Sequence, residues 1–481
     1  MSMGRRKRES QKDLWIAAER LESRGHPFYR ALNRILAASG FDAFVEAACE
    51  RFYTKDNGRP SIAPGVYFRM LLVGYFEGIG SERGIDWRCA DSLSLREFLG
   101  IATAEETPDH STISRTRRLI GIEAHKQIFE WILKLIADEG LVSGKTLGAD
   151  STTLEANAAM RSIVRRDSGQ SYHDYITDLA KAEGIESPTR EDLALFARGV
   201  DRKRKGKASN ADWKHESDPD ARIAKMKDGP HHLEGHMAHK LEQVVDMETG
   251  AVLAAEIHCA DQGDTITVTD TLTAAIETLE RLAEDEATAK KMDKRRGNEV
   301  VLDRSSPGGY HSDDVLTQLQ DMAITGYVSR PRLAKGKRRR WKGKETERLA
   351  TIANARRVKG DRGKRLMRKR GELLERPFAH ELETGGLRRT HVRGHEQVRK
   401  RIVIQAAAAN LGLLMRTKFG VGTPRRLQDR PVKVMEALEA FAGCVEGVVR
   451  LIVALLATLT ARCRPDRVIW RRLSASLWVA R

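Results

Sequence analysis

The chain has 481 residues, enough for two or three domains with a sizeable core. Its 84 lysine and arginine residues outnumber 67 acidic ones, and the formal charge of +17 favours a polyanionic partner, nucleic acid before anionic membrane. The five cysteines are scattered without a Cys-x-x-Cys pair, which fits a reducing compartment and argues against a disulfide framework or a zinc finger. The start lacks the apolar segment of a secretory signal, and the longest apolar run, 451–461, is too short to span a bilayer, so we expect a cytoplasmic protein.

Helical periodicity dominates residues 1–138. Apolar residues recur every three to four positions over 12–53 and 66–76, as amphipathic helices require. A turn-forming Asp-Asn-Gly-Arg-Pro run at 56–60 separates the two stretches. We therefore predict an all-helical, DNA-binding region at the N-terminus.

A basic helix is predicted after Asp109, whose carboxylate is placed to cap it. Its solvent-facing residues would include Arg115, Arg117 and Arg118. In a helix that enters or flanks a DNA groove, such arginines contact phosphates or guanines. An ordinary charged helix face accounts for them equally well, and both interpretations stay open at this point.

A short strand is predicted over 140–147, followed by Asp150 and a run of small hydroxyl residues. An aspartate at the tip of a buried strand is suited to meet a substrate or a metal ion, so further acids are expected from distant segments. Glu155 and Asn157 come next, either as groups that support the site or as plain surface residues. A polar insertion follows over about 159–235.

The insertion contains Asp218 and Asp220, which are more readily explained by a turn than by metal binding. Strand signals resume after it at 239–246 and, beyond a hairpin turn, at 251–258. Helical periodicity follows over 264–284.

A further strand is predicted over 298–302, and it ends on another carboxylate, Asp303. The order strand, strand, strand, helix, strand, helix, with acids that close separate elements, is typical of an RNase H-like core, an α/β fold with a mixed sheet flanked by helices. Such a core binds Mg²⁺ through oxygen ligands alone. Neither a serine triad, nor a glycine-rich phosphate loop, nor a zinc motif competes with this interpretation.

A basic segment at about 331–370 includes Arg338, Arg339, Arg340 and Trp341. Cations around a tryptophan suit phosphate contact combined with base stacking. A solvated loop without a specific role is the alternative.

Helices are predicted over 372–382 and 397–416, the second Ala-rich and buried. They complete a core domain that we expect to span 139–420. The remainder, 421–481, is predicted to be a helical tail whose apolar-periodic part, 432–461, packs on the core or on a second subunit.

An ordered series of short motifs resembles the DDE transposases of bacterial insertion sequences over nearly the whole chain. One motif alone is a weak signal, but the ordered series is specific. The matching motifs are Pro-Asp-His-Ser-Thr-Ile-Ser-Arg at 108–115, Gly-Ala-Asp-Ser-Thr-Thr-Leu-Glu-Ala-Asn-Ala at 148–158, Ser-Asp-Pro-Asp-Ala-Arg at 217–222, Ala-Asp-Gln-Gly-Asp-Thr at 260–265, Val-Leu-Asp at 301–303, Gly-Tyr-His-Ser at 309–312, Glu-Arg-Pro-Phe-Ala-His at 375–380, Gly-Gly-Leu-Arg-Arg at 385–389 and Asn-Leu-Gly-Leu-Leu at 410–414.

The resemblance implies three catalytic acids that also bind the metal ions: Asp150, Asp303 and Glu375. Competing choices for the second acid are Asp264 and Asp261. Glu372, about one helical turn before Glu375, competes for the third position.

Two departures from the family pattern affect the implied site. The family's Asp-Lys-Gly-Tyr run is contiguous, whereas residues 304–308 separate Asp303 from Gly309-Tyr310 here. The tyrosine and lysine that often flank the glutamate are absent, and Leu382 stands at the usual lysine position. The candidates to take over the phosphate contacts are Arg370, Arg376 and Arg388.

The resemblance implies a transposase that binds the terminal inverted repeats of a mobile element and hydrolyses the phosphodiester bond at the element end. Two Mg²⁺ ions, for which Mn²⁺ can substitute, would support in-line displacement at phosphorus. The freed 3′-hydroxyl would then attack target DNA in the same pocket.

The implied partners are double-stranded DNA, as repeats and as target, and a second copy of the chain, because synapsis of two ends favours a homodimer. The protein would associate with the nucleoid when it is bound to DNA. Two alternatives stay open: an RNase H-like nuclease without strand transfer, and a DNA-binding relic whose catalytic centre has decayed.

Overall fold

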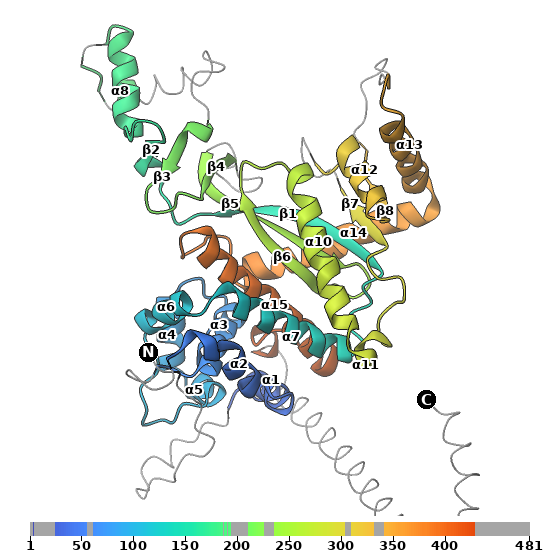
Figure 1. Ribbon diagram of the computed structural model, residues 1–481. Coiled ribbons are helices and arrows are strands. Elements are labelled where there is room, and N and C mark those ends of the chain that lie inside the picture. The colour runs from blue at the N-terminus through green and yellow to red at the C-terminus, as the bar shows by residue number, and fades with distance from the viewer. Residues whose placement is uncertain are drawn as a thin grey trace, which may run out of the picture. The chain divides into compact units, whose positions relative to one another are not determined.

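A computed structural model describes residues 25–54, 61–185, 187–189, 191–193, 210–225, 235–303, 309–330 and 341–428, together with Met3 (Figure 1). The chain divides into a compact unit, Met1–Pro424, and a second unit, Arg425–Arg481, whose described part is α16 (Arg425–Gln428). The apolar tail predicted over 432–461 lies outside the described residues. Among the helices that the structure describes, we find none with the length and apolar character that crossing a bilayer requires.

The described residues ahead of the sheet form helices and their connections, as predicted. These elements are α1 (Pro27–Ala38), α2 (Phe41–Cys49), the short turn η2 (Glu50–Phe52), α3 (Pro64–Glu77), α4 (Glu82–Ala90), α5 (Leu93–Leu99), α6 (His110–Leu119) and α7 (Ile122–Asp138). Pro27 and Pro64 start α1 and α3, at a position where a backbone donor is not needed. Asp109 caps α6 by accepting a hydrogen bond from the backbone N of Thr112 at 2.7 Å.

The long helix α15 (His395–Phe419) joins these helices to the sheet, because it packs against α3, α7 and the strand β6 (Val252–Cys259). Its alanines at 406–408 are fully buried, and their small side chains allow the neighbouring elements to approach closely. Asn410 fastens the helix to β6, since its side chain accepts from the backbone N of Val252 at 2.8 Å and donates to the carbonyl at 2.9 Å. The buried, Ala-rich helix predicted over 397–416 is thus confirmed.

A mixed sheet forms the centre of the part of the compact unit that follows α7 (Figure 1). Its other strands are β1 (Thr146–Glu155), β4 (Arg222–Lys225), β5 (Gly235–Asp246), β7 (Glu299–Leu302) and β8 (Thr325–Val328). They run in the order β4-β5-β1-β7-β8, and β6 also pairs with β5. β1, β5 and β6 are antiparallel neighbours, whereas β7 and β8 run parallel to β1. The hairpin and the strands predicted after the insertion are confirmed.

The first strand differs from its prediction. It begins at Thr146 instead of residue 140 and continues to Glu155, so that Asp150 lies in mid-strand and not beyond a strand tip. The cause is the long partner β5, which pairs with β1 from Leu147 through to Glu155. On the opposite edge of β1, the pairing with β7 stops at Ala149, so Asp150 follows the end of that pairing although β1 itself continues.

Helices cover both faces of the sheet (Figure 1). They are α10 (Asp264–Ala283), α11 (Glu286–Ala289), α12 (Asp313–Asp321), α13 (Glu345–Lys359) and α14 (Asp361–Ala379), which ends in the π-helical turn η5 (His380–Thr384). Ser151 donates to Asp264 at the start of α10, whereas the preceding residue, Asp150, pairs with Arg370 on α14. Because successive strand residues point to opposite faces, α10 and α14 lie on opposite sides of β1.

The basic segment is largely helical. α13 occupies its middle, and α14 begins at Asp361, well before the predicted start at residue 372. Apolar periodicity could not find these helices, because the buried residues of the first half of α14 are Gly363 and Arg370. Residues 331–340 lie outside the described part of the chain.

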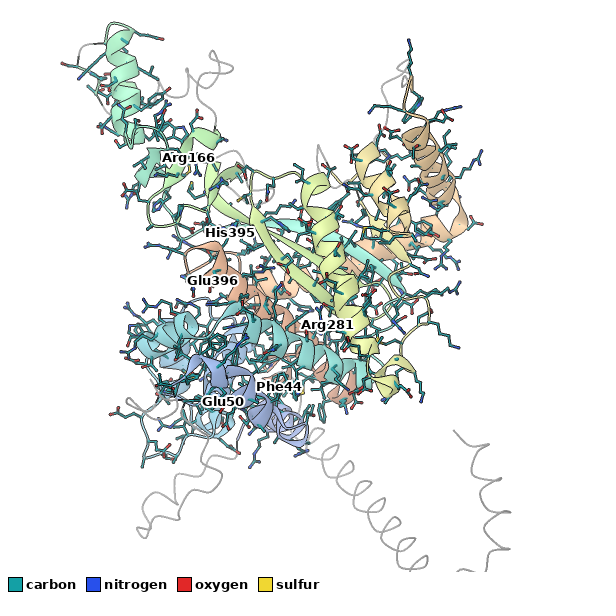
Figure 2. All side chains as sticks on the ribbon, viewed as in Figure 1. Phe44, Glu50, Arg166, Arg281, His395 and Glu396 are labelled. Carbon is teal, nitrogen blue, oxygen red and sulfur yellow. The ribbon has the colours of Figure 1, made fainter. Side chains whose placement is uncertain are left out.

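The polar insertion has a small core of its own. Its elements are η3 (Met160–Ser162), β2 (Ile163–Arg165), α8 (Tyr172–Ala182), η4 (Asn210–Asp212) and β3 (Trp213–His215). Trp213 is 4% exposed and packs with Ile163 and Met237, while the ring of Tyr172 meets it edge-on. Arg166, which Figure 2 labels, donates to the carbonyl of Trp213 at 3.2 Å and so ties β2 to β3.

Asp218 and Asp220 cap the N-terminus of α15, in agreement with a turn rather than a metal site. Asp218 accepts from the backbone N of Gly394 at 3.2 Å, and Asp220 accepts from that of His395 at 3.0 Å (His395 is labelled in Figure 2). Asp218 also lies 3.1 Å from Nε2 of the buried His239. Burial alone would raise the pKa of the Asp218 carboxyl, but the hydrogen bond and charge of His239, together with the backbone hydrogen bonds from Gly394 and Ala221, lower it below its usual value.

Candidate active site

Asp150 and Asp303 come from neighbouring parallel strands at the same level of the sheet. The last paired residues of β1 and β7 are Ala149 and Leu302, and the two aspartates follow them directly. Asp150 and Asp303 are far apart in the sequence, but they meet here because β1 and β7 are parallel and in register. The side chain of Asp150 is 13% exposed and that of Asp303 is 34% exposed, so the pair opens to solvent on the Asp303 side.

Arg370 on α14 bridges the two aspartates. Its Nη2 donates to Oδ2 of Asp150 at 2.8 Å and its Nη1 donates to Oδ2 of Asp303 at 3.0 Å. The side chain is only 5% exposed, and its Nε is buried without a hydrogen-bond partner. The sequence predicted Arg370 as a phosphate contact, whereas the structure places it inside the site as the counter-ion of both acids.

Glu375 is not brought to this pair. It lies five residues after Arg370, which is about 140° around an α-helix, and its side chain is exposed. Leu374 is the residue of this turn that packs against β1, where its Cδ1 reaches Gly148. Glu372 is exposed as well and pairs with Arg376 at 2.7 Å. Among the described residues, no group of three or more His, Cys, Asp or Glu side chains is arranged to hold a metal ion.

A different glutamate, Glu381 in η5, lies on the same face of the sheet as Asp150. It is fully buried and accepts from Nε2 of Gln243 at 2.5 Å, and Gln243 is the cross-strand partner of Asp150 on β5. Burial raises the pKa of the Glu381 carboxyl to about 8, and the hydrogen bond from Gln243 opposes this effect. Oε1 of Glu381 and Oε1 of Gln243 are buried without partners.

Sequence reasoning missed Glu381, although a signal was present. Arg370, Leu374, Pro377 and Glu381 follow one another at the i, i+4, i+7, i+11 spacing of a single helix face, and all four are buried. A glutamate at the end of such a helix face is expected to be buried like the other residues of that face. The family pattern directed attention to Glu375 instead.

Asp264, the alternative second acid, lies on the α10 face of the sheet. It accepts from Oγ of Ser151 at 2.8 Å and pairs with Nζ of Lys240 at 2.8 Å. Its carboxylate is therefore separated from that of Asp150 by the thickness of β1. Asp261 is exposed and pairs with Arg222 at 3.5 Å.

The α10 face holds a buried polar network around Glu242. Tyr310 donates to its Oε1 at 3.0 Å and Thr271 donates to its Oε2 at 2.7 Å, while Lys240 lies 3.8 Å from Oε1. Burial raises the pKa of Glu242, and the charge of Lys240 opposes the shift. Because Tyr310 belongs to the Gly-Tyr motif, this network anchors the chain shortly after Asp303 to β5.

The predicted DNA-binding residues of α6 differ in exposure. Arg115 and Arg118 are exposed, as expected. Arg117 is only 11% exposed, pairs with Glu82 and donates to Oε1 of Gln397 at 3.0 Å. The expected solvent-facing position of Arg117 is wrong, because α6 packs against α4 and α15 on that side.

The other predicted phosphate contacts are paired or not described. Arg376 forms its ion pair with Glu372, and Arg388 pairs with Glu383; both arginines are exposed. Trp341 is partly buried. Arg338, Arg339 and Arg340 lie outside the described residues.

Glu155, the last residue of β1, and Asn157, which lies just beyond it, both hold the end of the strand in place. The backbone N of Glu155 donates to the carbonyl of Arg388 at 3.0 Å, and Nδ2 of Asn157 donates to the carbonyl of His391 at 3.2 Å. These contacts fasten the strand to the segment between η5 and α15.

Comparison with known proteins identifies one part of the chain. Residues 16–119 match the family model described as "Transposase domain (DUF772)", which is consistent with a transposase of the insertion-sequence type. The match ends at the last residue of α6 and does not reach Asp150 or Asp303. No curated protein and no solved structure matches the chain significantly.

Proposed function

We propose that the protein is an insertion-sequence transposase that binds terminal inverted repeats and performs metal-dependent DNA cleavage and strand transfer at Asp150 and Asp303. The observation that carries the proposal is the pair itself: two carboxylates that follow neighbouring parallel strands, held together beneath α14. The transposase-domain match over 16–119 supports it independently, because it concerns a different part of the chain.

The topology of the sheet supports an RNase H-like core. Three antiparallel strands, β1, β5 and β6, are followed by α10, then by the parallel strand β7, by α12 and by the parallel strand β8. This is the strand, strand, strand, helix, strand, helix order on which the expectation of such a core rested. Both aspartates lie near the centre of that sheet, on one face.

The chemistry of the donors fits Mg²⁺. Asp150 and Asp303 offer only oxygen atoms, and Mg²⁺ is commonly held by one or two carboxylates, with water and substrate phosphate in the remaining positions. These two residues would hold the ion, and Mn²⁺ is expected to substitute for it. When bound, such ions supply charge stabilisation for in-line displacement at phosphorus. A second ion would need a further acid.

The third acid is proposed from the family pattern, as Glu375. Because this side chain points away from the sheet, α14 has to turn or shift before Glu375 can join the two aspartates. Glu381 already lies on the correct face but is closed off from solvent. Substitution of each residue is therefore part of the test.

The charge distribution favours DNA as the partner. The chain carries a net charge of +17, and Arg115 and Arg118 stand exposed on α6, within the transposase-domain match. Arginines at such positions position a duplex through its phosphates. A homodimer that brings two element ends together, in the cytoplasm and on the nucleoid, completes the proposal.

The test uses the full-length protein and a duplex whose end carries the inverted repeat found beside the gene. With Mg²⁺ or Mn²⁺ we expect nicking at the repeat boundary, and joining of a pre-cleaved 3′-hydroxyl end to a target plasmid. Asp150→Asn and Asp303→Asn should strongly reduce both reactions, and Glu375→Gln is compared with Glu381→Gln. Cleavage without joining would indicate a nuclease. Equal background activity of the wild type and Asp150→Ala would indicate a DNA-binding relic.

A further inference from the structure

We propose that Arg370 takes the place of a divalent cation between Asp150 and Asp303, and that a cation can bind these acids only by displacing the guanidinium group. The inference rests on the proposed function for the identity of the metal ligands. It adds a positioning residue that couples metal binding to the release of a buried arginine. Neither the family pattern nor the charge of the chain indicates such a coupling.

The contacts of Arg370 are divided between the two acids. A guanidinium group commonly binds one carboxylate with two parallel hydrogen bonds. Here Nη1 donates to Asp303 and Nη2 donates to Asp150, at 3.0 and 2.8 Å, so one cation spans two anions. That is the electrostatic arrangement that a shared metal ion would produce. Without Arg370, the neighbouring carboxylates of Asp150 and Asp303 would repel each other.

The position of Arg370 is held by charge and not by complete hydrogen bonding. Its Nε is buried and has no hydrogen-bond partner, although the side chain is only 5% exposed. Buried donors are normally paired, so the unpaired Nε means that the guanidinium group makes fewer hydrogen bonds here than it is able to make. A side chain that is kept in place by two ion pairs alone can leave when another cation takes over those two partners.

Displacement gives Arg370 a second role at the same site. Asp303 is 34% exposed, so the site opens to solvent beside the guanidinium group. A phosphate group of a bound DNA strand would face this opening, and a guanidinium fork matches phosphate oxygens. The residue would thus hold the acids before the metal arrives and contact the substrate afterwards.

The experiment measures Mn²⁺ binding to the full-length protein without DNA, by isothermal titration calorimetry, together with the unfolding temperature. The variants are Arg370→Gln, Arg370→Lys and, as a matched control on the same helix, Arg365→Gln, whose side chain is exposed. Asp150→Asn reports whether the measured ion binds at this site. None of these readouts depends on catalytic activity.

We expect Arg370→Gln to bind Mn²⁺ at least tenfold more tightly than the wild type, because the competing cation is gone. Without metal, this variant should unfold at a lower temperature, and Mn²⁺ should raise that temperature more than it does for the wild type. Arg370→Lys, which can reach only one acid at a time, should fall between the two and keeps the test valid if Arg370→Gln folds poorly. Arg365→Gln should behave like the wild type.

The outcomes separate this inference from the proposed function. If Asp150→Asn abolishes Mn²⁺ binding but Arg370→Gln and Arg370→Lys bind no more tightly than the wild type, the inference is wrong while the metal site stands. If Asp150→Asn binds Mn²⁺ as the wild type does, the ligand assignment fails and the inference fails with it.

Discussion

Each face of β1 carries a cluster of polar side chains, but the two clusters differ in how fully their buried atoms are hydrogen-bonded. On the α10 face, Lys240, Glu242, Asp264 and Tyr310 are joined by hydrogen bonds and ion pairs, and none of these side chains leaves a buried atom unpartnered. On the α14 face, by contrast, Nε of Arg370, Oε1 of Gln243 and Oε1 of Glu381 are each buried without a hydrogen-bond partner.

Neighbouring residues of one strand thus enter opposite environments. Ser151 completes the α10 network, whereas Asp150 belongs to a cluster whose hydrogen-bonding capacity is partly unused. Complete networks rigidify a core, while unsatisfied buried groups often mark a site where something else binds. We interpret the α10 face as the support and the α14 face as the reactive surface.

The largest expected difference concerns activity. Asp150→Asn or Asp303→Asn should reduce DNA cleavage by roughly 10³-fold, about 4 kcal/mol in activation free energy, because each removes a charged oxygen donor from the site. Asp264→Asn on the α10 face should keep the rate per folded molecule within roughly tenfold of the wild type. The measurement is single-turnover cleavage of a repeat-ended duplex, with folding checked by circular dichroism. A loss of cleavage in Asp264→Asn as large as in Asp150→Asn would contradict the division of the two faces.

The next effect is a pH dependence of stability on the α14 face. Burial raises the pKa of Glu381 from 4.5 to about 8, so the native state binds the proton more tightly than the unfolded state. The stabilisation is complete below pH 4.5 and is lost as the pH rises through about 8. The free energy of unfolding should therefore fall between pH 5 and 8, by at most about 1.4 kcal/mol per pH unit.

Urea denaturation at several pH values measures this slope. Glu381→Gln should flatten it, because the amide stays neutral throughout. Glu383→Gln, in the same turn but exposed, is the matched control and should keep the slope of the wild type. Equal slopes in Glu381→Gln and the wild type would show that Glu381 is ionised in the native state.

A smaller effect is expected from the α10 network. Tyr310→Phe removes the donor to Oε1 of Glu242 and should lower the free energy of unfolding by about 2 kcal/mol, since a buried carboxylate loses a partner. Thr269→Val on α10 removes an exposed hydrogen bond to Gln318 and should change stability by no more than about 0.5 kcal/mol. Chemical denaturation of both variants provides the measurement. Equal losses of stability in the two variants would mean that the buried hydrogen bond from Tyr310 to Glu242 contributes no more than an exposed one.

The smallest effect belongs to the outer side of α14. Glu372→Gln breaks the exposed ion pair with Arg376 and should lower stability by about 0.3–0.5 kcal/mol, because solvent screens such pairs. Loss of the buried bridge in Arg370→Gln should be several times larger. Thermal unfolding in low salt measures both. A similar loss of stability in the two variants would mean that solvent screens the ion pairs of Arg370 as it does that of Glu372.

Much of the fold was predictable from local patterns. The strands β5 and β6 were marked by a hairpin turn, the helix α10 by its helical periodicity and the helix α15 by its Ala-rich, apolar composition. The start of α14 was not, because its first half is rich in Lys and Arg and buries little apolar surface. The extent of β1 depends on how far β5 accompanies it, which no local signal in β1 contains.

The two acids of the site could be predicted from the sequence, but the position of Arg370 between them could not. Asp150 and Asp303 were singled out from strand ends and from the family resemblance, and the structure brings them together. The position of Arg370 between them follows from the direction in which α14 crosses β1, and Arg117 turned inward for a similar reason, the packing of α6 against α4. Tertiary packing decides such cases, and the sequence of a single helix does not reveal it.

In the proposed function, Asp150 and Asp303 together bind a catalytic divalent cation. Crystals of the full-length protein grown with Mn²⁺, with data collected at the manganese absorption edge, test it most directly. We predict an anomalous peak about 2 Å from an oxygen of each carboxylate, with the guanidinium group of Arg370 moved away from both. Manganese peaks elsewhere, with Arg370 still bridging the two aspartates, would show that Asp150 and Asp303 are not the metal ligands.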